Sequence, residues 1–180
     1  MFQVASITKS FKEKAVLKGV SFSIEEGDKI ALLGNNGAGK STLFNIIAGQ
    51  LQADSGTIKT SLDFQREIGM MPQGDLLIED LTLAEFVELK SRMNQLKQAD
   101  INGLLEMVEL RGSKEQMVGS LSGGQKRRLS LLLTILNHPK LIFLDEPTTG
   151  MDLEAVDNFW KLFYKSPDFK RGSNCCRKDC

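Results

Sequence analysis

The sequence lacks several features on which whole classes of protein depend. Its 23 Lys and Arg residues equal its 23 Asp and Glu residues, so the formal net charge is zero. A protein that clamps nucleic acid by neutralising phosphates usually carries a basic surplus, and we therefore expect no nucleic-acid partner. Cysteine occurs only near the end of the chain, where Cys175, Cys176 and Cys180 match neither a paired zinc framework nor a distributed disulfide scaffold.

Long apolar runs are also missing. No stretch approaches the ~18 residues that a membrane-spanning helix needs, because Ser130 and Thr134 interrupt the longest candidate, at residues 129–136. The first residues do not show the basic and then apolar pattern of a secretion signal. We therefore expect a cytoplasmic chain that reaches the inner face of the cell membrane only through a partner.

The sequence does contain a regular α/β pattern of ordinary composition. Its 180 residues, of which 41% are hydrophobic and 26% charged, suit one soluble domain. Residues 20–24 alternate apolar and small polar side chains, which predicts a strand with one buried face. The continuous apolar runs at residues 30–33 and 141–144 predict strands that are buried on both faces.

Helical signals are concentrated after the first third of the chain. Thr82 and Glu85 form a capping box that predicts a helix to about Met93, and the apolar spacing from Ile101 to Val108 predicts another. We interpret residues 79–118 as a small helical subdomain inserted into the α/β core. Further helices are expected at residues 41–48, 125–137 and 153–162.

One glycine-rich segment matches the G-x-x-x-x-G-K-S phosphate loop, which arises by chance in roughly one chain of this length in two hundred. A strand is predicted before it and a helix after it, as such a loop requires. Its glycines leave backbone N–H groups open toward phosphate oxygens, and the helix start adds its positive dipole end. Lys40 would reach the β- and γ-phosphates, and the Ser41 hydroxyl would coordinate Mg²⁺. The predicted nucleotide-binding residues here are Gly34, Asn35, Asn36, Gly37, Ala38, Gly39, Lys40, Ser41 and Thr42.

The strand predicted at residues 141–144 ends in two acidic residues, Asp145 and Glu146. Asp145 would emerge at the sheet edge where open α/β sheets bind ligands, and in phosphate-loop NTPases such an aspartate holds Mg²⁺. The plainer interpretation is an exposed acidic pair that closes a strand. Beside a phosphate loop that interpretation is weak for Asp145 and somewhat stronger for Glu146.

A second glycine-rich segment, Leu121-Ser122-Gly123-Gly124-Gln125, is rarer by chance than the phosphate loop. Ser122 suits a helix N-cap, and the two glycines bare the backbone of the helix start, which makes a second anion site. One nucleotide needs only one such cradle. The surplus is explained if this segment serves a nucleotide that another subunit holds.

With these motifs in this order, residues 1–165 resemble the ATP-binding subunit of ATP-binding-cassette (ABC) transporters. The resemblance implies a phosphate-loop NTPase (RecA-like) α/β core with an N-terminal antiparallel β subdomain and the inserted helical subdomain. It implies ATP and Mg²⁺ as cofactors, ATP hydrolysis, and a membrane permease subunit that the hydrolysis drives. It also implies a head-to-tail homodimer or a paired ATP-binding subunit, in which residues 122–125 close over the partner's ATP.

The same resemblance gives roles to single residues. Glu146 matches the general base that polarises the attacking water. Gln73 matches the glutamine that lies at the metal and the γ-phosphate and couples to the membrane subunit. Phe11 stands where an aromatic ring stacks on adenine, and residues 149–152 resemble the loop that crosses the dimer interface.

The family pattern stops near Lys165. The family continues with an apolar strand and a switch histidine, whereas residues 166–180 contain neither, and the only histidine is His138. We therefore expect an atypical tail, such as a truncated or frameshifted end gives, and a sheet without its last core strand. Two alternatives stay open: an ATP-binding module that no longer turns over, and a soluble ABC-type ATPase.

Overall fold

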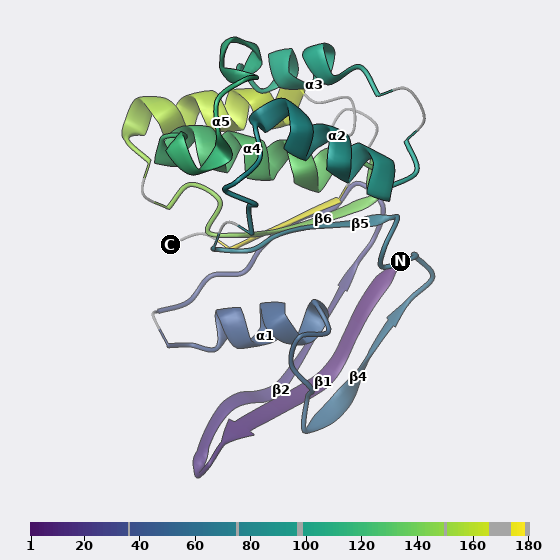
Figure 1. Ribbon diagram of the computed structural model, residues 1–180. Coiled ribbons are helices and arrows are strands. Elements are labelled where there is room, and N and C mark those ends of the chain that lie inside the picture. Colours follow the sequence, from purple (N-terminus) through teal and green to yellow (C-terminus); the bar gives the residue numbers. More distant parts are fainter. Residues whose placement is uncertain (36, 75, 97–98, 150, 166–173, 179–180) are drawn as a thin grey trace.

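The computed structural model describes residues 1–35, 37–74, 76–96, 99–149, 151–165 and 174–178. Two sheets and a layer of helices are stacked on one another (Figure 1). Helix α1 (Lys40–Ile47) lies between the two sheets, and the other helices cover the opposite face of the parallel sheet. The arrangement confirms the predicted α/β core with an N-terminal antiparallel sheet.

The first sheet is antiparallel and has the strand order β2-β1-β4. Its strands are β1 (Phe2–Phe11), β2 (Lys14–Ile24) and β4 (Ser55–Thr60). The alternation predicted at residues 20–24 is confirmed, because Val20 and Phe22 are partly buried, Ile24 is buried, and the serines between them are exposed. The inner face of this sheet packs on α1 through a cluster that includes Phe2, Leu43 and further aliphatic side chains.

The second sheet is parallel and has the strand order β3-β7-β6-β5. Its strands are β3 (Lys29–Ala31), β5 (Ile68–Met71), β6 (Leu141–Asp145) and β7 (Asn174–Lys178). β6 is buried along its whole length, as predicted. At residues 30–33 the predicted strand is present only as far as Ala31, and the predicted burial on both faces is wrong, because Ala31 and Leu33 are exposed. β3 is an edge strand that ends at Ala31, so the chain leaves the sheet before its apolar run is complete.

The expectation that the sheet lacks its last core strand is also wrong. The backbone of β7 pairs in parallel with β3, where Cys175 lies opposite Lys29, and with β6, where Asn174 lies opposite Leu141. A strand in this position satisfies backbone donors and acceptors on both neighbours. Backbone pairing of this kind does not depend on an apolar run, whose absence from residues 166–180 led to the expectation of a missing strand. The remaining tail residues, 166–173 and 179–180, lie outside the described residues.

Helices α2 (Leu83–Met93) and α3 (Ile101–Met107) and two short 3-10 turns (Arg111–Ser113 and Val118–Ser120) precede α4 (Gly123–Ile135). The capping box at the start of α2 is confirmed: the backbone N–H of Glu85 donates to Thr82 Oγ1, and the backbone N–H of Thr82 donates to the Glu85 carboxylate. α2 and α3 share a buried cluster with α4, which includes Phe86, Leu105 and Leu129. α5 (Leu153–Lys165) packs its Phe159 against the face of the parallel sheet.

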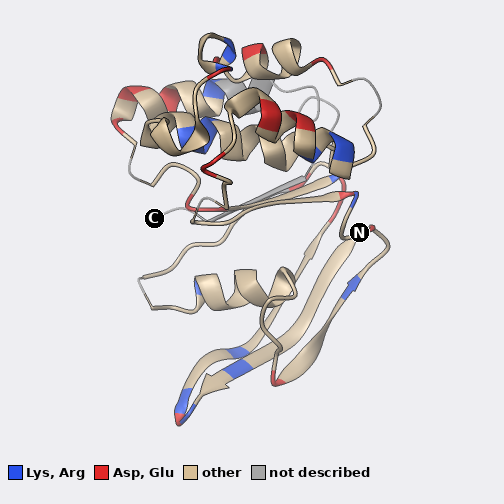
Figure 2. Cartoon of the chain, in the orientation of Figure 1, with Lys and Arg blue, Asp and Glu red and all other residues tan. Residues whose placement is uncertain are grey.

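Charged side chains of both signs lie on the helical layer (Figure 2). Two ion pairs connect α4 to the segment before it, Lys126 to Glu79 at 3.0 Å and Arg128 to Glu109 at 3.0 Å. These two ion pairs therefore connect the first turns of α4 to the segments that contain Glu79 and Glu109. In the part of the chain that the structure describes, we find no helix with the length and apolar character that crossing a membrane demands.

Candidate functional site

The loop between β3 and α1 depends on glycine at two positions. Gly37 and Gly39 have φ values of +81° and +90°, in the left-handed region that other residues rarely adopt. Gly39 is also in a tight place, because a Cβ atom there would lie 2.8 Å from side-chain atoms of both Val16 and Leu17. The loop thus lies directly against β2 at the start of α1, where a larger residue does not fit.

Lys40, the first residue of α1, folds back into this loop. Its side chain is buried, and its ammonium group donates to the carbonyl oxygens of Gly34 and, at 3.3 Å, of Asn35. The N-cap of α1, Gly39, provides no side-chain hydrogen bond to the helix start. Because the first N–H groups of a helix carry partial positive charge, this end of α1 combines a lysine ammonium with a helix dipole, as an anion site requires.

A cavity of about 380 Å³ opens at this loop. It is lined by the phosphate-loop residues 37–42 together with Phe11, Val16 and Glu146. Phe11 ends β1, is 47% exposed and lines the cavity, and the Lys9 ammonium lies over its ring, 5.8 Å from the ring centre. The fold therefore brings three predicted site elements together from distant parts of the sequence: the phosphate loop, the aromatic residue and the predicted base.

Two neighbouring strand ends supply the acidic side of the site. Met71 and Leu144 are partners in the pairing of β5 with β6, and the chains continue from there to Gln73 and Glu146. The Gln73 side-chain amide donates to Glu146 Oε2 at 2.9 Å, and the Thr149 hydroxyl donates to the same oxygen at 3.3 Å. The parallel register thus places the two predicted catalytic side chains in contact.

Asp145 is the last residue of β6, and it is only 4% exposed. Its carboxylate is therefore fixed at the carboxyl end of the sheet, next to Glu146. Glu146 itself has a φ of +46°, which a non-glycine residue adopts only when its surroundings hold it there. The chain turns at this point, where the Thr149 N–H donates to the Glu146 carbonyl oxygen at 3.2 Å, and Glu146 lines the cavity.

Sequence reasoning missed one residue at this turn. Arg127 is 4% exposed and donates through Nη1 to the carbonyl oxygen of Pro72 at 3.2 Å and through Nη2 to that of Glu146 at 2.7 Å. A signal was present, because Arg127 lies at helical spacing from the apolar residues Leu131 and Ile135, both of which are buried. The helix predicted at residues 125–137 contains Arg127, but no role is predicted for this residue.

The second glycine-rich segment forms the start of α4. Ser122 is the N-cap, as predicted, and it forms a capping box with Gln125, whose amide also donates to Ser113 Oγ at 3.1 Å. A Cβ atom at Gly123 or Gly124 would meet nothing within 4 Å. No contact inside the described chain therefore accounts for glycine at these two positions. Residues 122–125 are not among those that line the phosphate-loop cavity.

The remaining predicted residues are placed as follows. Asn36, and Gly150 of the segment 149–152, lie outside the described residues. Asp152 accepts a hydrogen bond from the backbone N–H of Ala155 at 2.8 Å and so caps the start of α5. His138 lies in the turn after α4, with its backbone N–H bonded to the Ile135 carbonyl oxygen.

Comparison with known proteins gives consistent matches. Residues 17–149 match the family model described as ABC transporter. The Nod factor export ATP-binding protein I of Rhizobium sp. (strain N33) is 37% identical, over 88% of this chain and 56% of that protein. YxlF of Bacillus subtilis (strain 168), an uncharacterized ABC transporter ATP-binding protein, is 38% identical, over 84% of this chain and 54% of that protein. The chain thus spans about half the length of the curated relatives it matches.

A solved structure agrees with these matches. A dimeric ATP-binding cassette in a post-hydrolysis state, bound to ADP and Pi, superimposes with a TM-score of 0.84 at 27% identity. The superposition covers 99% of this chain and 87% of that one.

Proposed function

The chain belongs to the ABC transporter family, and from that membership we propose that it is the ATP-binding and ATP-hydrolysing subunit of a multisubunit transporter. The observation that carries this proposal is the hydrogen-bonded pair of Gln73 and Glu146, which stands beside the cavity of the phosphate loop. A carboxylate and an amide in contact at a phosphate site can together orient and deprotonate a water molecule.

The groups around the cavity suit ATP in their chemistry. The backbone of residues 34–39 and the ammonium of Lys40 would hold the phosphates, with Asn35, Ser41 and Thr42 adding polar groups at the same end. Phe11 would stack on adenine, since its half-exposed aromatic side chain lines the cavity. Ser41, Gln73 and Asp145 would hold Mg²⁺, which neutralises charge on the transferred phosphoryl group when it is bound.

The residues of this chain would act in a fixed order. The helix start and Lys40 bind the triphosphate and stabilise the charge that develops on it. Gln73 positions Glu146 through their hydrogen bond, and Glu146 accepts a proton from the water that attacks the γ-phosphorus. Hydrolysis removes the ATP that holds the two subunits together, so the site opens and releases phosphate and ADP.

We assign the start of α4 to the nucleotide of a paired subunit. Gly123 and Gly124 present an open helix start that no residue in the described part of the chain fills, and Ser122 is its N-cap. Two subunits would close over two ATP molecules and reopen after hydrolysis. This movement would drive the permease. In the Glu146→Gln variant, Mg-ATP is expected to convert monomer to dimer, measured by sedimentation velocity. A monomer at saturating ATP would contradict this assignment.

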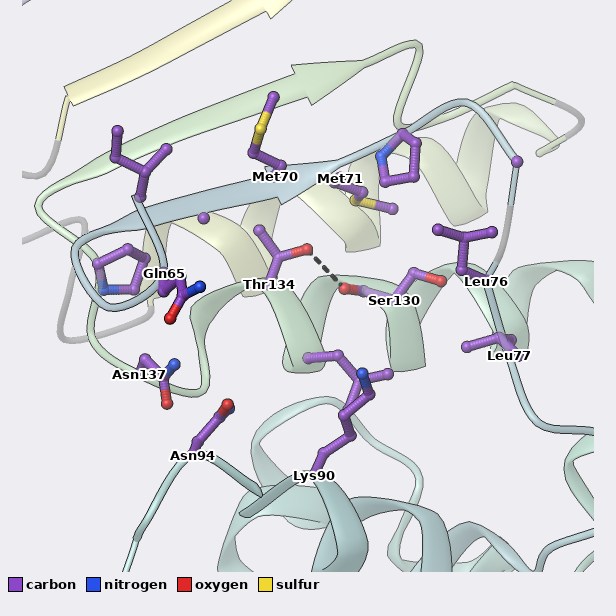
Figure 3. Close-up of a pocket in the computed structure, with 16 residues that line it drawn as sticks. Gln65, Met70, Met71, Leu76, Leu77, Lys90, Asn94, Ser130, Thr134 and Asn137 are labelled. Carbon is purple, nitrogen blue, oxygen red and sulfur yellow. Dashed lines mark hydrogen bonds between the residues drawn. The ribbon is translucent and has the colours of Figure 1, made fainter. Parts of the chain in front are cut away.

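The permease would bind in the groove shown in Figure 3. This groove of about 260 Å³ lies between β5, α4 and the end of α2, and it continues to Pro72 and Gly74 on either side of Gln73. Leu76 at its rim is 77% exposed, while Lys90, Asn94 and Asn137 add polar groups. A groove with both apolar and polar lining suits a protein segment. Because the groove lies beside Gln73, movement of that segment would be coupled through Gln73 to the site of the γ-phosphate.

Membrane binding tests the groove. Leu76→Asp is expected to reduce sedimentation of the chain with membrane vesicles from the source cells, because a charge on an apolar contact is costly to desolvate. Met117→Asp is the matched control, since Met117 is also exposed, at 44%, but does not line the groove. Equal loss in both variants, or binding to protein-free vesicles of the same lipids, would contradict a permease at this groove.

Phosphate release from Mg-ATP by the purified chain is the decisive experiment. We expect turnover that falls about 100-fold or more in Glu146→Gln, with ATP binding retained. Glu115→Gln, in an exposed loop, is the matched control and should keep the full rate. Absence of turnover in a folded chain that binds ATP would instead support the alternative of a binding module, and absence of ATP binding would refute the proposal.

A further inference from the structure

Arg127 is buried in a place where a charge is costly. It belongs to α4, it is 4% exposed, and it lies on the buried stripe of that helix with Leu131 and Ile135. A guanidinium removed from water must have its donors satisfied, because its desolvation is expensive. Two of its nitrogens donate to main-chain carbonyl oxygens, those of Pro72 and Glu146.

These two carbonyls belong to the two segments that carry the predicted catalytic pair. Pro72 immediately precedes Gln73, and the second carbonyl is that of Glu146 itself. The segments are the continuations of β5 and β6, which are adjacent and parallel. One guanidinium thus spans the gap between two loops on the side of α4, while the Gln73 amide spans it at the cavity.

Glu146 needs such support because of its backbone. Its φ of +46° is unfavourable for a residue with a side chain. Its carbonyl oxygen accepts from the Thr149 N–H at 3.2 Å within the turn and from Arg127 Nη2 at the shorter distance of 2.7 Å. A charge-assisted bond is stronger than a neutral one, so the arginine contact is well suited to hold the turn in this conformation.

We propose that Arg127 is a positioning residue that fixes Gln73 and Glu146 relative to each other and so sets the geometry for water attack. It acts through main-chain carbonyls and touches no reacting atom. We call the two hydrogen bonds from Arg127 to the carbonyl oxygens of Pro72 and Glu146 the clamp. Because Ser122 is the N-cap of the helix that carries Arg127, the clamp also connects the start of α4 to the turn at Glu146. The proposal rests on the function proposed above, in which Glu146 is the base.

Arginine is required for this role because its planar fork offers separate nitrogens in fixed directions, whereas a lysine ammonium is a compact point donor. Arg127→Lys keeps the charge and removes the fork, and Arg127→Gln keeps a planar donor and removes the charge. Arg128→Lys is the matched control. Arg128 is the next residue of the same helix, and it forms an ion pair with Glu109 that lysine can also make.

Steady-state hydrolysis of Mg-ATP by the full chain is the first test. In Arg127→Lys, kcat is expected to fall about 10- to 100-fold because the catalytic pair loses its alignment. The KM for ATP and the ATP affinity are expected to stay within about twofold, because the phosphate loop is untouched. Arg128→Lys should keep both values. A loss in Arg127→Lys that appears in KM and not in kcat, or an equal loss in both variants, would overturn the proposal.

Amide hydrogen exchange gives a second readout that needs no turnover. Arg127→Lys and Arg127→Gln are expected to exchange faster at residues 72–74 and 146–149, with α1 unchanged, and Arg128→Lys should match the unmodified chain. If the unmodified chain does not hydrolyse ATP, this exchange pattern still tests the clamp while the proposed function fails. Unchanged exchange at both segments in both Arg127 variants would overturn the proposal, whatever the kinetics.

Discussion

The side-chain amide of Gln73 and the carboxylate of Glu146 meet at 2.9 Å, although 73 residues separate them in the chain. The contact arises from the register of β5 and β6, whose residues Met71 and Leu144 are partners two positions earlier. Side chains at the carboxyl ends of adjacent parallel strands share one edge of the sheet, where ligands bind in open α/β folds. The relation is therefore a consequence of strand pairing, and it gives the pair a defined geometry before any ligand arrives.

Removing the amide should separate binding from chemistry. In Gln73→Ala, we expect kcat to fall about 10- to 100-fold, because Glu146 loses a hydrogen bond that fixes its orientation. ATP affinity should fall much less, because Lys40 and the phosphate loop still hold the triphosphate when one of the three proposed Mg²⁺ ligands is removed. Single-turnover hydrolysis and equilibrium ATP binding measure the two effects separately. Gln52→Ala, at an exposed position, serves as the control. A variant that loses affinity and keeps its single-turnover rate would show that Gln73 serves binding alone.

Replacing the amide by a carboxylate should shift the pH dependence. In Gln73→Glu, two carboxylates would stand in contact, and a like charge raises the pKa of at least one of the pair. Glu146 acts as a base only when ionised, so the acidic limb of the pH–rate profile should move to higher pH. The profile of kcat between about pH 5 and pH 9 measures this shift. An acidic limb in its original place would mean that the two side chains do not meet during turnover.

Gly39→Ala should disrupt the phosphate loop and also lower stability. The new Cβ would lie 2.8 Å from Val16 and Leu17 side-chain atoms, at a φ of +90°. Strain of this kind costs about 1–3 kcal/mol in the free energy of unfolding, and the displaced loop should lose most of its ATP affinity. Urea unfolding and ATP titration measure both. Gly112→Ala is the matched control, because a Cβ there would meet nothing within 4 Å.

Ligand binding should raise the melting temperature in a metal-dependent way. At a concentration of 100 times its dissociation constant, ATP adds about 2.7 kcal/mol to the stability of the folded chain. That corresponds to a rise in Tm of about 5–10 °C for a chain of this size. The rise should shrink when EDTA removes Mg²⁺ and should be absent in Lys40→Ala. A rise that EDTA leaves unchanged would contradict a metal ion shared by the protein and the nucleotide.

Local patterns in the sequence were sufficient for much of this fold. The capping box at Thr82, the N-cap at Ser122 and the doubly buried strand β6 follow from short-range spacing, and all three are present. The glycine-rich loop between strand and helix is also present, and its requirement for glycine at Gly39 has a physical cause in the contact with β2. Such features depend on a few neighbouring residues, which is why the sequence reveals them.

Features that depend on pairing between distant segments were harder to predict. β7 was missed because the tail has no apolar run, yet its backbone completes the pairing of β3 and β6. Helical spacing from Leu131 and Ile135 indicated that Arg127 is buried, but its partners could not be predicted, because main-chain carbonyls of residues 72 and 146 leave no pattern in the side-chain sequence. The exposure of Leu33 follows from the edge position of β3, which is a property of the assembled sheet.

The last prediction concerns acid stability and a contact far from the phosphate loop. Asp54, just before β4, accepts a hydrogen bond from Lys9 Nζ at 2.7 Å and one from the Ser10 N–H at 2.6 Å. These bonds, that of Lys9 first, lower the pKa of Asp54 below its ordinary value. A carboxyl whose pKa is lower in the folded chain than in the unfolded chain contributes stability that is fully present above the unfolded pKa of about 3.9. That contribution is lost as the pH falls through the lower, folded pKa.

The variant Asp54→Asn resembles the protonated form and should therefore show the complementary behaviour. Its free energy of unfolding should be lower than that of the unmodified chain between about pH 5 and pH 7, and the difference should shrink below about pH 4. Urea unfolding at a series of pH values measures it. Lys9→Met should weaken the same pH dependence, because it removes the larger cause of the pKa shift. If the difference between Asp54→Asn and the unmodified chain persists unchanged into acid, the stabilisation by Asp54 does not depend on its charge.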